Sequence, residues 1–202
     1  MHKTRLIVMP GGVSTSTIML ALGKRGLKNI KKALFQLQVP YLGFCAGAYL
    51  ASRIHKFDSG NLVLPFLSDA PTVFSGAAAG PVTQESAGYE NARNVALYHA
   101  GKKIVGPLYY NHGPAFEGTQ SNPHITVLAR YITSNNLPEA ALPPAIIHSR
   151  EGNANAVLSG VHPEFPVANR APEPEDAYLC AQFSETTLQV MLQSLGIKLT
   201  VE

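Results

Sequence analysis

Two apolar runs, residues 4–9 and 39–44, lie near the start of the chain, and each ends at a turn that contains glycine. The residues between them, 16–38, are suited to a helix, and the glycines near residues 23–26 predict an interruption in it. The order of strand, long helix and strand predicts a right-handed βαβ unit in a parallel sheet.

The remainder of the chain is predicted to form short strands followed by one helix. The expected strands are residues 95–98, 103–110, 125–132, 145–150 and 155–159. Two pairs of them are joined by tight turns with glycine, which is typical of hairpins. Residues 60–81 are rich in Gly, Ala, Pro and Ser and are expected to be irregular. Residues 172–195 are predicted to form an amphipathic helix, because acidic residues at its start suit a helix N-terminus.

Composition places the chain among globular domains. Hydrophobic residues make up 46% and charged residues 14% of its 202 residues, which is enough apolar material for one substantial core. No linker or internal repeat divides it, so residues 1–202 are interpreted as a single domain. No apolar run is long enough to span a bilayer, and the start lacks the features of a signal peptide. We therefore expect no membrane partner and a cytoplasmic location.

Charge and cysteine usage exclude several kinds of site. The net charge is only +3, and the basic cluster over residues 24–32 is interpreted as a solvated helix face. A nucleic-acid site would need a denser patch with aromatic residues, so no nucleic-acid partner is expected. Cys45 and Cys180 are far apart and lack the spacing of a disulfide framework or a metal site. We expect no metal and no cofactor.

The segment Gly-Phe-Cys-Ala-Gly at residues 43–47 is typical of a nucleophile elbow. An apolar strand ends at Cys45, a helix-capable stretch follows, and the flanking glycines suit a tight turn in which side chains would collide. Such a turn points the thiol into a cleft and leaves the backbone N–H of Ala46 at a helix N-terminus. A buried cysteine in an ordinary strand–helix loop is the alternative.

A second segment supplies partners for this cysteine. His162 and Glu164 flank a proline after a β-rich run, and the proline holds the two side chains rigidly relative to one another. A cysteine nucleophile needs a base, and the base needs a third group to orient it. Cys45, His162 and Glu164 therefore form a candidate catalytic triad, although His-Pro-Glu also occurs in plain surface loops.

Three motifs together resemble the class I glutamine amidotransferase-like superfamily: Pro-Gly-Gly at residues 10–12, the elbow, and His-Pro-Glu. Longer segments narrow the resemblance. Residues 41–49, 109–116 and 159–165 resemble the domain found at the N-terminus of eukaryotic biotin–protein ligases and as stand-alone bacterial proteins. The resemblance implies an α/β, three-layer, flavodoxin-like fold with a mostly parallel sheet, whose cleft lies at the carboxyl ends of the strands. Ligase activity is not implied, since it belongs to a separate C-terminal domain.

The chain departs from the superfamily pattern at three places. Tyr49 stands where the glutaminases usually carry glutamine, and Gly160-Val161 replaces their Gln-Phe, which counts against glutamine as the substrate. The first βαβ unit of the family is apparently lacking, since the chain starts almost directly on the strand at residues 4–9. An apolar edge strand is a template for association. We expect upstream residues, a second copy in a homodimer or a partner protein to cover this edge.

The resemblance also suggests roles around the cysteine. Gly11, Gly12 and Ala46 are candidates for the oxyanion hole, while ATP binding is excluded because the Gly-Lys-Ser/Thr ending of a phosphate loop is missing. The candidate cleft-lining residues are Tyr49, Asn111, His112 and Gly113.

The function predicted from these residues is thiol-dependent acyl chemistry on a small-molecule or peptide amide. Cys45 attacks the carbonyl carbon, His162 moves the proton and Glu164 orients His162. The enzyme is then an amidotransferase-like protein or an amide hydrolase, with a peptidase-like hydrolase as a variant. The alternative is a binding or regulatory module that keeps the fold and turns over nothing.

Overall fold

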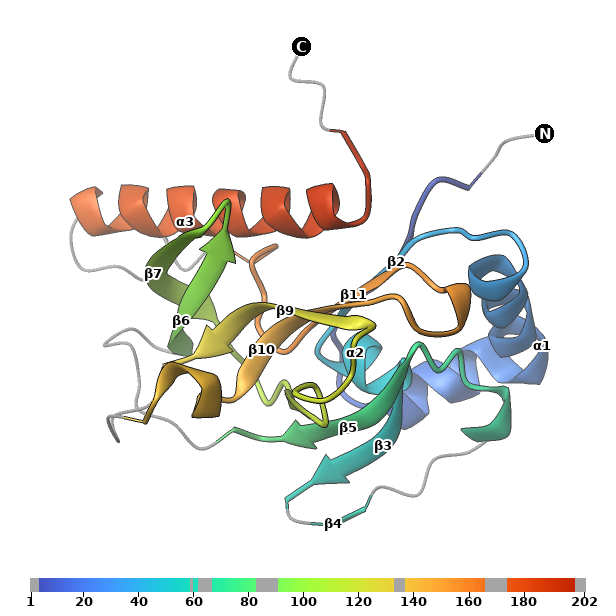
Figure 1. Ribbon diagram of the computed structural model, residues 1–202. Coiled ribbons are helices and arrows are strands. Elements are labelled where there is room, and N and C mark those ends of the chain that lie inside the picture. Colours follow the sequence, from blue (N-terminus) through green and yellow to red (C-terminus); the bar gives the residue numbers. More distant parts are fainter. Residues whose placement is uncertain are drawn as a thin grey trace.

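The computed structural model describes residues 4–58, 60–61, 67–82, 91–132, 137–165 and 174–198. Within this part of the chain, two sheets and three α-helices form three layers (Figure 1). The larger sheet has the order β1-β2-β11-β10-β9-β6-β7. Its strands are β1 (Ile7–Met9), β2 (Tyr41–Phe44), β11 (Ala156–Ser159), β10 (Pro144–Ser149), β9 (Ile125–Tyr131), β6 (Ala92–His99) and β7 (Lys102–Tyr109).

The predicted βαβ unit is present at one end of this sheet. β1 and β2 are parallel neighbours, joined by helix α1 (Thr15–Phe35), and β11 adds to β2 in parallel. The Ser14 side chain caps α1 by accepting a hydrogen bond from Thr17 N at 3.1 Å. The expected interruption also occurs, because Gly23 has φ 58° and ψ 178° inside the helix. Sequence pattern alone therefore located this unit correctly.

The sheet as a whole is mixed, which confirms the α/β class but not the expected predominance of parallel strands. β11, β10, β9, β6 and β7 are antiparallel to one another along the order of the sheet. The reason is local, because short turns join β6 to β7 and β10 to β11, and strands joined in this way run antiparallel. Ala100 and Gly101 between β6 and β7 have φ of 50° and 74°, as a two-residue hairpin turn requires.

A second sheet of order β4-β3-β5-β8 lies beside the first and corrects two expectations. Its strands are β4 (Gly60–Asn61), β3 (Ser52–Phe57), β5 (Phe74–Gly80) and β8 (Ala115–Glu117). β5 lies in the segment expected to be irregular, because its glycines and alanines carry little strand signal and pairing with β3 and β8 decides its structure. β3 follows directly after α2 (Ala46–Leu50), which is shorter than the helix-capable stretch suggested.

Apolar residues alternate between the two faces of the large sheet and build a core on each. Tyr41, Ile147 and Leu158 point to the side of α1 and the second sheet. The adjacent Leu42, Ile146 and Val157 point to α3 (Pro174–Ser194), the predicted C-terminal helix. Figure 1 shows α3 on one side of the sheet and α1, β3 and β5 on the other. The remaining elements are the 3₁₀ turns η1 (Leu67–Asp69), η2 (Glu139–Ala141) and η3 (Glu151–Asn153).

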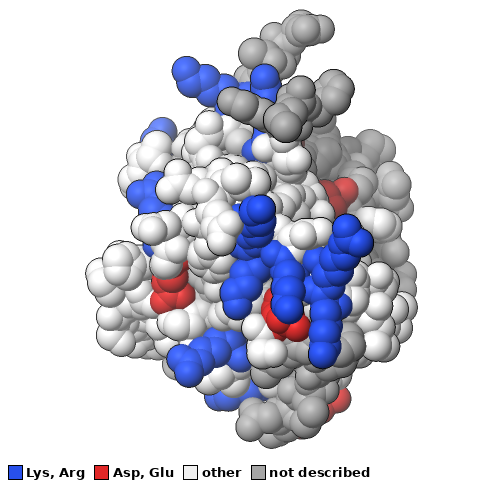
Figure 2. Space-filling view, turned by 90° about the vertical axis from the view of Figure 1, so that its right-hand side faces the viewer, with Lys and Arg blue, Asp and Glu red and all other residues white. Residues whose placement is uncertain are grey.

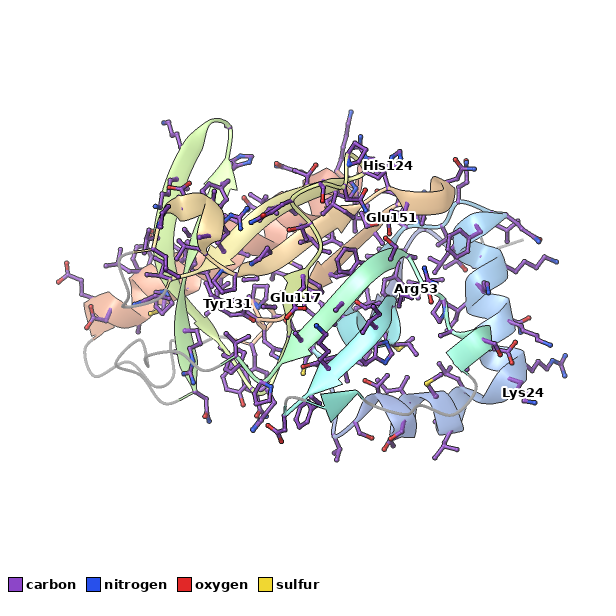
Figure 3. The ribbon with its side chains drawn as sticks, turned by 60° about the horizontal axis from the view of Figure 1, so that its bottom comes forward. Lys24, Arg53, Glu117, His124, Tyr131 and Glu151 are labelled. Atoms are coloured by element: carbon purple, nitrogen blue, oxygen red, sulfur yellow. The ribbon has the colours of Figure 1, made fainter. Side chains whose placement is uncertain are left out.

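Glu151 holds the two sheets together at their junction (Figure 3). Its carboxylate accepts hydrogen bonds from Ser75 N at 2.5 Å and Ser75 Oγ at 2.6 Å, and another from Asn122 Nδ2. Since Ser75 belongs to β5, this carboxylate fixes the second sheet, and with it β3, against the turn between β10 and β11.

The exposed face of α1 carries the basic cluster (Figure 2). Its exposed members are Lys24, Arg25, Lys28, Lys31 and Lys32. Asp69 lies among them, 4.0 Å from Lys28 Nζ. Among the helices that the structure describes, none has the length and apolar character needed to cross a membrane.

Candidate active site

Cys45 stands at a strained turn between β2 and α2. Its backbone has φ 46° and ψ −108°, as predicted for an elbow, and a non-glycine residue adopts such a conformation only when its surroundings impose it. Those surroundings are hydrogen bonds. Cys45 N donates to Ser159 O at 2.8 Å, while Cys45 O accepts from Ala48 N and Tyr49 N, both at 2.9 Å. The sheet and the helix together therefore fix the direction of the thiol.

Glycine at position 47 lets the elbow approach β1. A Cβ atom at Gly47 would press against the carbonyl oxygen of Met9, closer than real Cβ contacts come. Tyr41 Oη also donates to Gly47 O at 2.8 Å, which ties the first turn of α2 back to β2. The loop after β1 thus lies directly beside the cysteine because this glycine has no side chain.

His162 is held between strands and aromatic rings. Its backbone N–H donates to Tyr109 O at 2.8 Å, so the segment after β11 continues as a bridge to the end of β7. The ring stacks with Phe44 at 6.4 Å between centroids and meets Tyr109 edge to face at 5.7 Å. Glu164 Oε1 lies 2.7 Å from Nδ1, which leaves Nε2 for the other side of the ring. The imidazole is therefore oriented as a base requires.

The two segments predicted from sequence meet at this ring. His162 lies next to Cys45, close enough for the cysteine to raise the pKa of the imidazole. A Cβ atom on Gly11 would lie 2.6 Å from His162 Cε1 and 3.3 Å from Cys45 Cβ, so the loop after β1 lies against both residues. Cys45 Sγ also lies 3.4 Å from Asn111 O.

Burial and hydrogen bonding shift the pKa of His162 in opposite directions. Its side chain is 11% exposed, and burial by itself lowers the pKa. The hydrogen bonds with Cys45 and Glu164, with the negative charge of Glu164, outweigh burial and raise the pKa to about 9. His162 therefore carries a proton at neutral pH, next to the sulfur on one side and a carboxylate on the other.

A cavity of about 430 Å³ opens in front of Cys45. Its lining residues are Gly12, Val13, Ser14, Thr15, Cys45, Ala46, Tyr49, His55, Phe57, Asn111 and His112. The structure thus places Gly12, Ala46, Tyr49, Asn111 and His112 in the same pocket as the cysteine. Volumes of this order are typical of small-molecule sites.

Four other residues named from the sequence lie outside this lining. Gly11, His162 and Glu164 are not among the residues that line the cavity, although Gly11 and His162 lie next to Cys45. Gly113 is buried under the loop that presents Asn111 and His112, and its carbonyl accepts a hydrogen bond from Tyr110 Oη at 3.1 Å. Tyr131 supports the same loop, since its Oη donates to Pro114 O at 3.0 Å (Figure 3).

Sequence reasoning missed one wall of the pocket, which is formed by His55 and Phe57. Both belong to β3, where residues two positions apart share a face of the strand. That spacing was the available signal, and the expectation of a longer helix after the elbow hid it.

The N-termini of two helices meet at the pocket. The first N–H groups of any helix lack intrahelical partners, so Ala46 at the start of α2 has its N–H available for an oxyanion. Thr15 Oγ1 donates to Ala46 O at 3.4 Å and ties the start of α1 to the elbow. Among the described residues, no group of three or more His, Cys, Asp or Glu side chains could hold a metal ion. Cys180 lies on α3, packed against Ala92.

Comparisons with known proteins agree with the resemblance. A family model described as "Biotin-protein ligase, N terminal" matches residues 1–196. The chain is 28% identical over 212 residues to a biotin–protein ligase of Schizosaccharomyces pombe, covering 97% of this chain and 31% of that protein. It is 31% identical over 172 residues to an uncharacterized protein of Chlamydia muridarum, covering 81% and 62%. The chain thus spans less than two thirds of either relative.

The fold is shared with solved structures at low sequence identity. A crystal structure of a glutamine amidotransferase superposes with a TM-score of 0.55 at 16% identity, over 96% of this chain and 80% of the other. This likeness supports the α/β, flavodoxin-like class and no more than that.

Proposed function

Since the chain belongs to the family of biotin-protein ligase N-terminal domains, we propose that it is a cysteine-dependent enzyme of the glutamine amidotransferase-like kind that acts on carboxylic amides. Cys45 is the nucleophile, His162 the general base and acid, and Glu164 the residue that orients His162. The backbone N–H groups of Gly12 and Ala46, with Gly11 beside them, form the oxyanion hole.

The proposed reaction has two stages. Cys45 first gives its thiol proton to His162 Nε2, which forms the charged imidazole described above, and the resulting thiolate Sγ attacks the carbonyl carbon of the amide. The carbonyl oxygen takes the negative charge of the tetrahedral intermediate and is stabilised by the N–H groups. The C–N bond then breaks as His162 protonates the leaving amine, which leaves a thioester on Cys45. Water or an acceptor amine then attacks the thioester and gives its proton to His162. The C–S bond breaks, the acyl product leaves, and the proton on His162 is again shared with the Cys45 sulfur.

One observation carries this proposal. Cys45 lines a pocket, has a strained backbone with positive φ, and lies beside a histidine whose Nδ1 is 2.7 Å from a carboxylate oxygen. Backbone strain at a cysteine is stabilised only by surrounding structure and is frequent at functional sites. A merely structural cysteine needs neither the strain nor the oriented imidazole.

Thiol alkylation tests the proposal without knowledge of the substrate. In a Cys180→Ser background only Cys45 reacts with iodoacetamide, so its rate can be followed against pH. We expect His162→Gln to lower the rate on the order of tenfold or more at neutral pH, and Glu164→Gln to lower it less. Equal rates in all three proteins would contradict the proposal.

The alternative function, a binding or regulatory module, is favoured by one residue. Tyr49 occupies the position where the resembling glutaminases carry glutamine, and its hydroxyl lies 3.5 Å from His112 O across the pocket. A slow Cys45 that is insensitive to His162→Gln, combined with ligand binding in the pocket, would establish this alternative.

A further inference from the structure

The pocket in front of Cys45 is free of formal side-chain charge along the part of its lining that the structure describes. None of those lining residues is Asp, Glu, Lys or Arg. The floor is buried and consists of Thr15, Cys45, Ala46, Tyr49 and His55. The rim is exposed and includes Val13, whose side chain is fully exposed.

Aromatic rings form one continuous wall from floor to rim. Tyr49 meets His55 at 82° and Phe57 at 62°, and Phe57 lies tilted at 30° to His112, each pair with centroids 6.4 Å apart. Burial lowers the pKa of His55, and its Nε2 lies 2.6 Å from Ser52 O, so at neutral pH this ring is uncharged and its polar edge is occupied. The wall therefore offers ring surface rather than charge.

The nearest described carboxylates are engaged elsewhere or lie outside the pocket. Glu164 is bound to the far side of the His162 ring. Asp58 is exposed after the end of β3 and does not line the cavity. An ammonium or carboxylate on the acyl part of a substrate would thus lose hydration on the floor, where none of the described lining residues is an Asp, Glu, Lys or Arg that could pair with it. Burial of an unpaired charge is strongly unfavourable.

We infer that the acyl part of the substrate is an uncharged carboxamide bearing a ring, and that Tyr49, His55 and Phe57 determine this specificity. The inference rests on the proposed function for the reacting atoms, because Cys45 must attack the carboxamide carbon while the ring lies against the aromatic wall. Free glutamine, which carries both an ammonium and a carboxylate, is a poor fit for the same reason.

Binding to the Cys45→Ala variant tests the inference separately from turnover. Three probes share the benzamide group and differ in their para substituent, which is hydrogen in benzamide, anionic in 4-carbamoylbenzoate and cationic in 4-(aminomethyl)benzamide. We expect calorimetry to show benzamide binding at least about tenfold more tightly than either charged probe, and more tightly than free glutamine. Absence of benzamide binding, or equal or tighter binding of a charged probe or of glutamine, would overturn the inference.

Two substitutions identify the residues responsible, both measured in the Cys45→Ala background. Phe57→Ala should weaken benzamide binding several-fold, whereas Phe35→Ala, which removes a similarly half-buried ring outside the pocket, should not.

Val13→Arg places a cation at the rim on a fully exposed position, so folding is not at risk. It should strengthen 4-carbamoylbenzoate binding roughly two- to fivefold, and Val105→Arg on β7 should not. Equal effects of Val13→Arg and Val105→Arg would contradict the assignment.

The two proposals fail in different ways. If Cys45 alkylates rapidly in a His162-dependent manner and the pocket prefers charged amides, only the inference on the substrate fails. If Cys45 is inert and benzamide still binds, the enzyme proposal fails and the pocket keeps its preference as a binding site.

Discussion

The two cysteines of this chain are both buried, yet they lie in opposite kinds of surroundings. Cys45 is 8% exposed and Cys180 is 2% exposed, so exposure hardly separates them. Cys45 follows the end of β2 with a strained backbone and lies beside His162. Cys180 lies within a regular helix and packs against Ala92. The comparison teaches that the neighbours of a thiol, rather than its burial, distinguish a candidate nucleophile from a packing residue.

The parallel and antiparallel halves of the large sheet also differ in how their elements contact one another. In the parallel half, Gly47 lets the elbow approach the backbone of β1, and Gly11 lets the loop after β1 approach the side chains of His162 and Cys45. In the antiparallel half, hairpins stack side chains against α3. The approaches at Gly11 and Gly47 thus lie where the candidate chemistry lies, and the predictions below test this contrast.

The largest expected effect is the ratio of alkylation rates in the native protein. Cys45 should react with iodoacetamide on the order of 100-fold faster than Cys180, because Cys45 lies beside an imidazole oriented by Glu164 and lines a cavity. Mass spectrometry of peptides after timed labelling measures both rates at once. In strong denaturant the ratio should fall close to one, and a native ratio near one would remove the contrast.

The elbow should tolerate side chains far less than its surroundings. Gly47→Val should destabilise the fold by about 1–3 kcal/mol, since the new Cβ collides with the backbone of Met9. Gly12→Val is the matched control, because nothing lies within 4 Å of a Cβ at that position. Urea unfolding followed by circular dichroism gives both values. A Gly47→Val protein as stable as Gly12→Val would show that the turn is looser than described.

Local sequence signals were sufficient for the parallel half and insufficient for the pocket. The glycines around Cys45 and the His-Pro-Glu segment predicted the meeting of these residues because each motif is read from a few adjacent positions. The pocket wall at His55 and Phe57 depends on pairing between β3 and β5, which lie far apart in the sequence. β5 itself is built of alanine and glycine, so its existence is decided by tertiary contacts that no local propensity reports. The antiparallel direction of β6 and β7, and of β10 and β11, follows from the hairpins predicted from their turns with glycine.

The pH dependence of stability should distinguish His162 from an ordinary buried histidine. Its pKa is raised from 6.5 to about 9, so the stability it contributes is fully present below pH 6.5 and is lost as the pH rises through about 9. The difference in unfolding free energy between the unmodified chain and His162→Gln should therefore shrink between pH 6.5 and 9.5. His55, whose pKa is lowered by burial, should show the opposite trend, with stability lost in acid. A flat difference for His162 would contradict the assigned interactions.

The smallest expected effect concerns the two edges of the large sheet. β7 carries Lys102, Lys103 and Pro107, which discourage pairing with another strand. Among the strands that the structure describes, β1 pairs only with β2; it contains no charge and exposes half of the Val8 side chain. We expect weak, concentration-dependent self-association through β1. Val8→Lys should weaken this self-association a few-fold, whereas Val105→Lys on β7 should leave it unchanged. Sedimentation velocity over a range of concentrations measures it. A monomer at every concentration, or equal effects of the two lysine variants, would mean that β1 is no more prone to pairing than β7, and that its edge is protected by means other than charge.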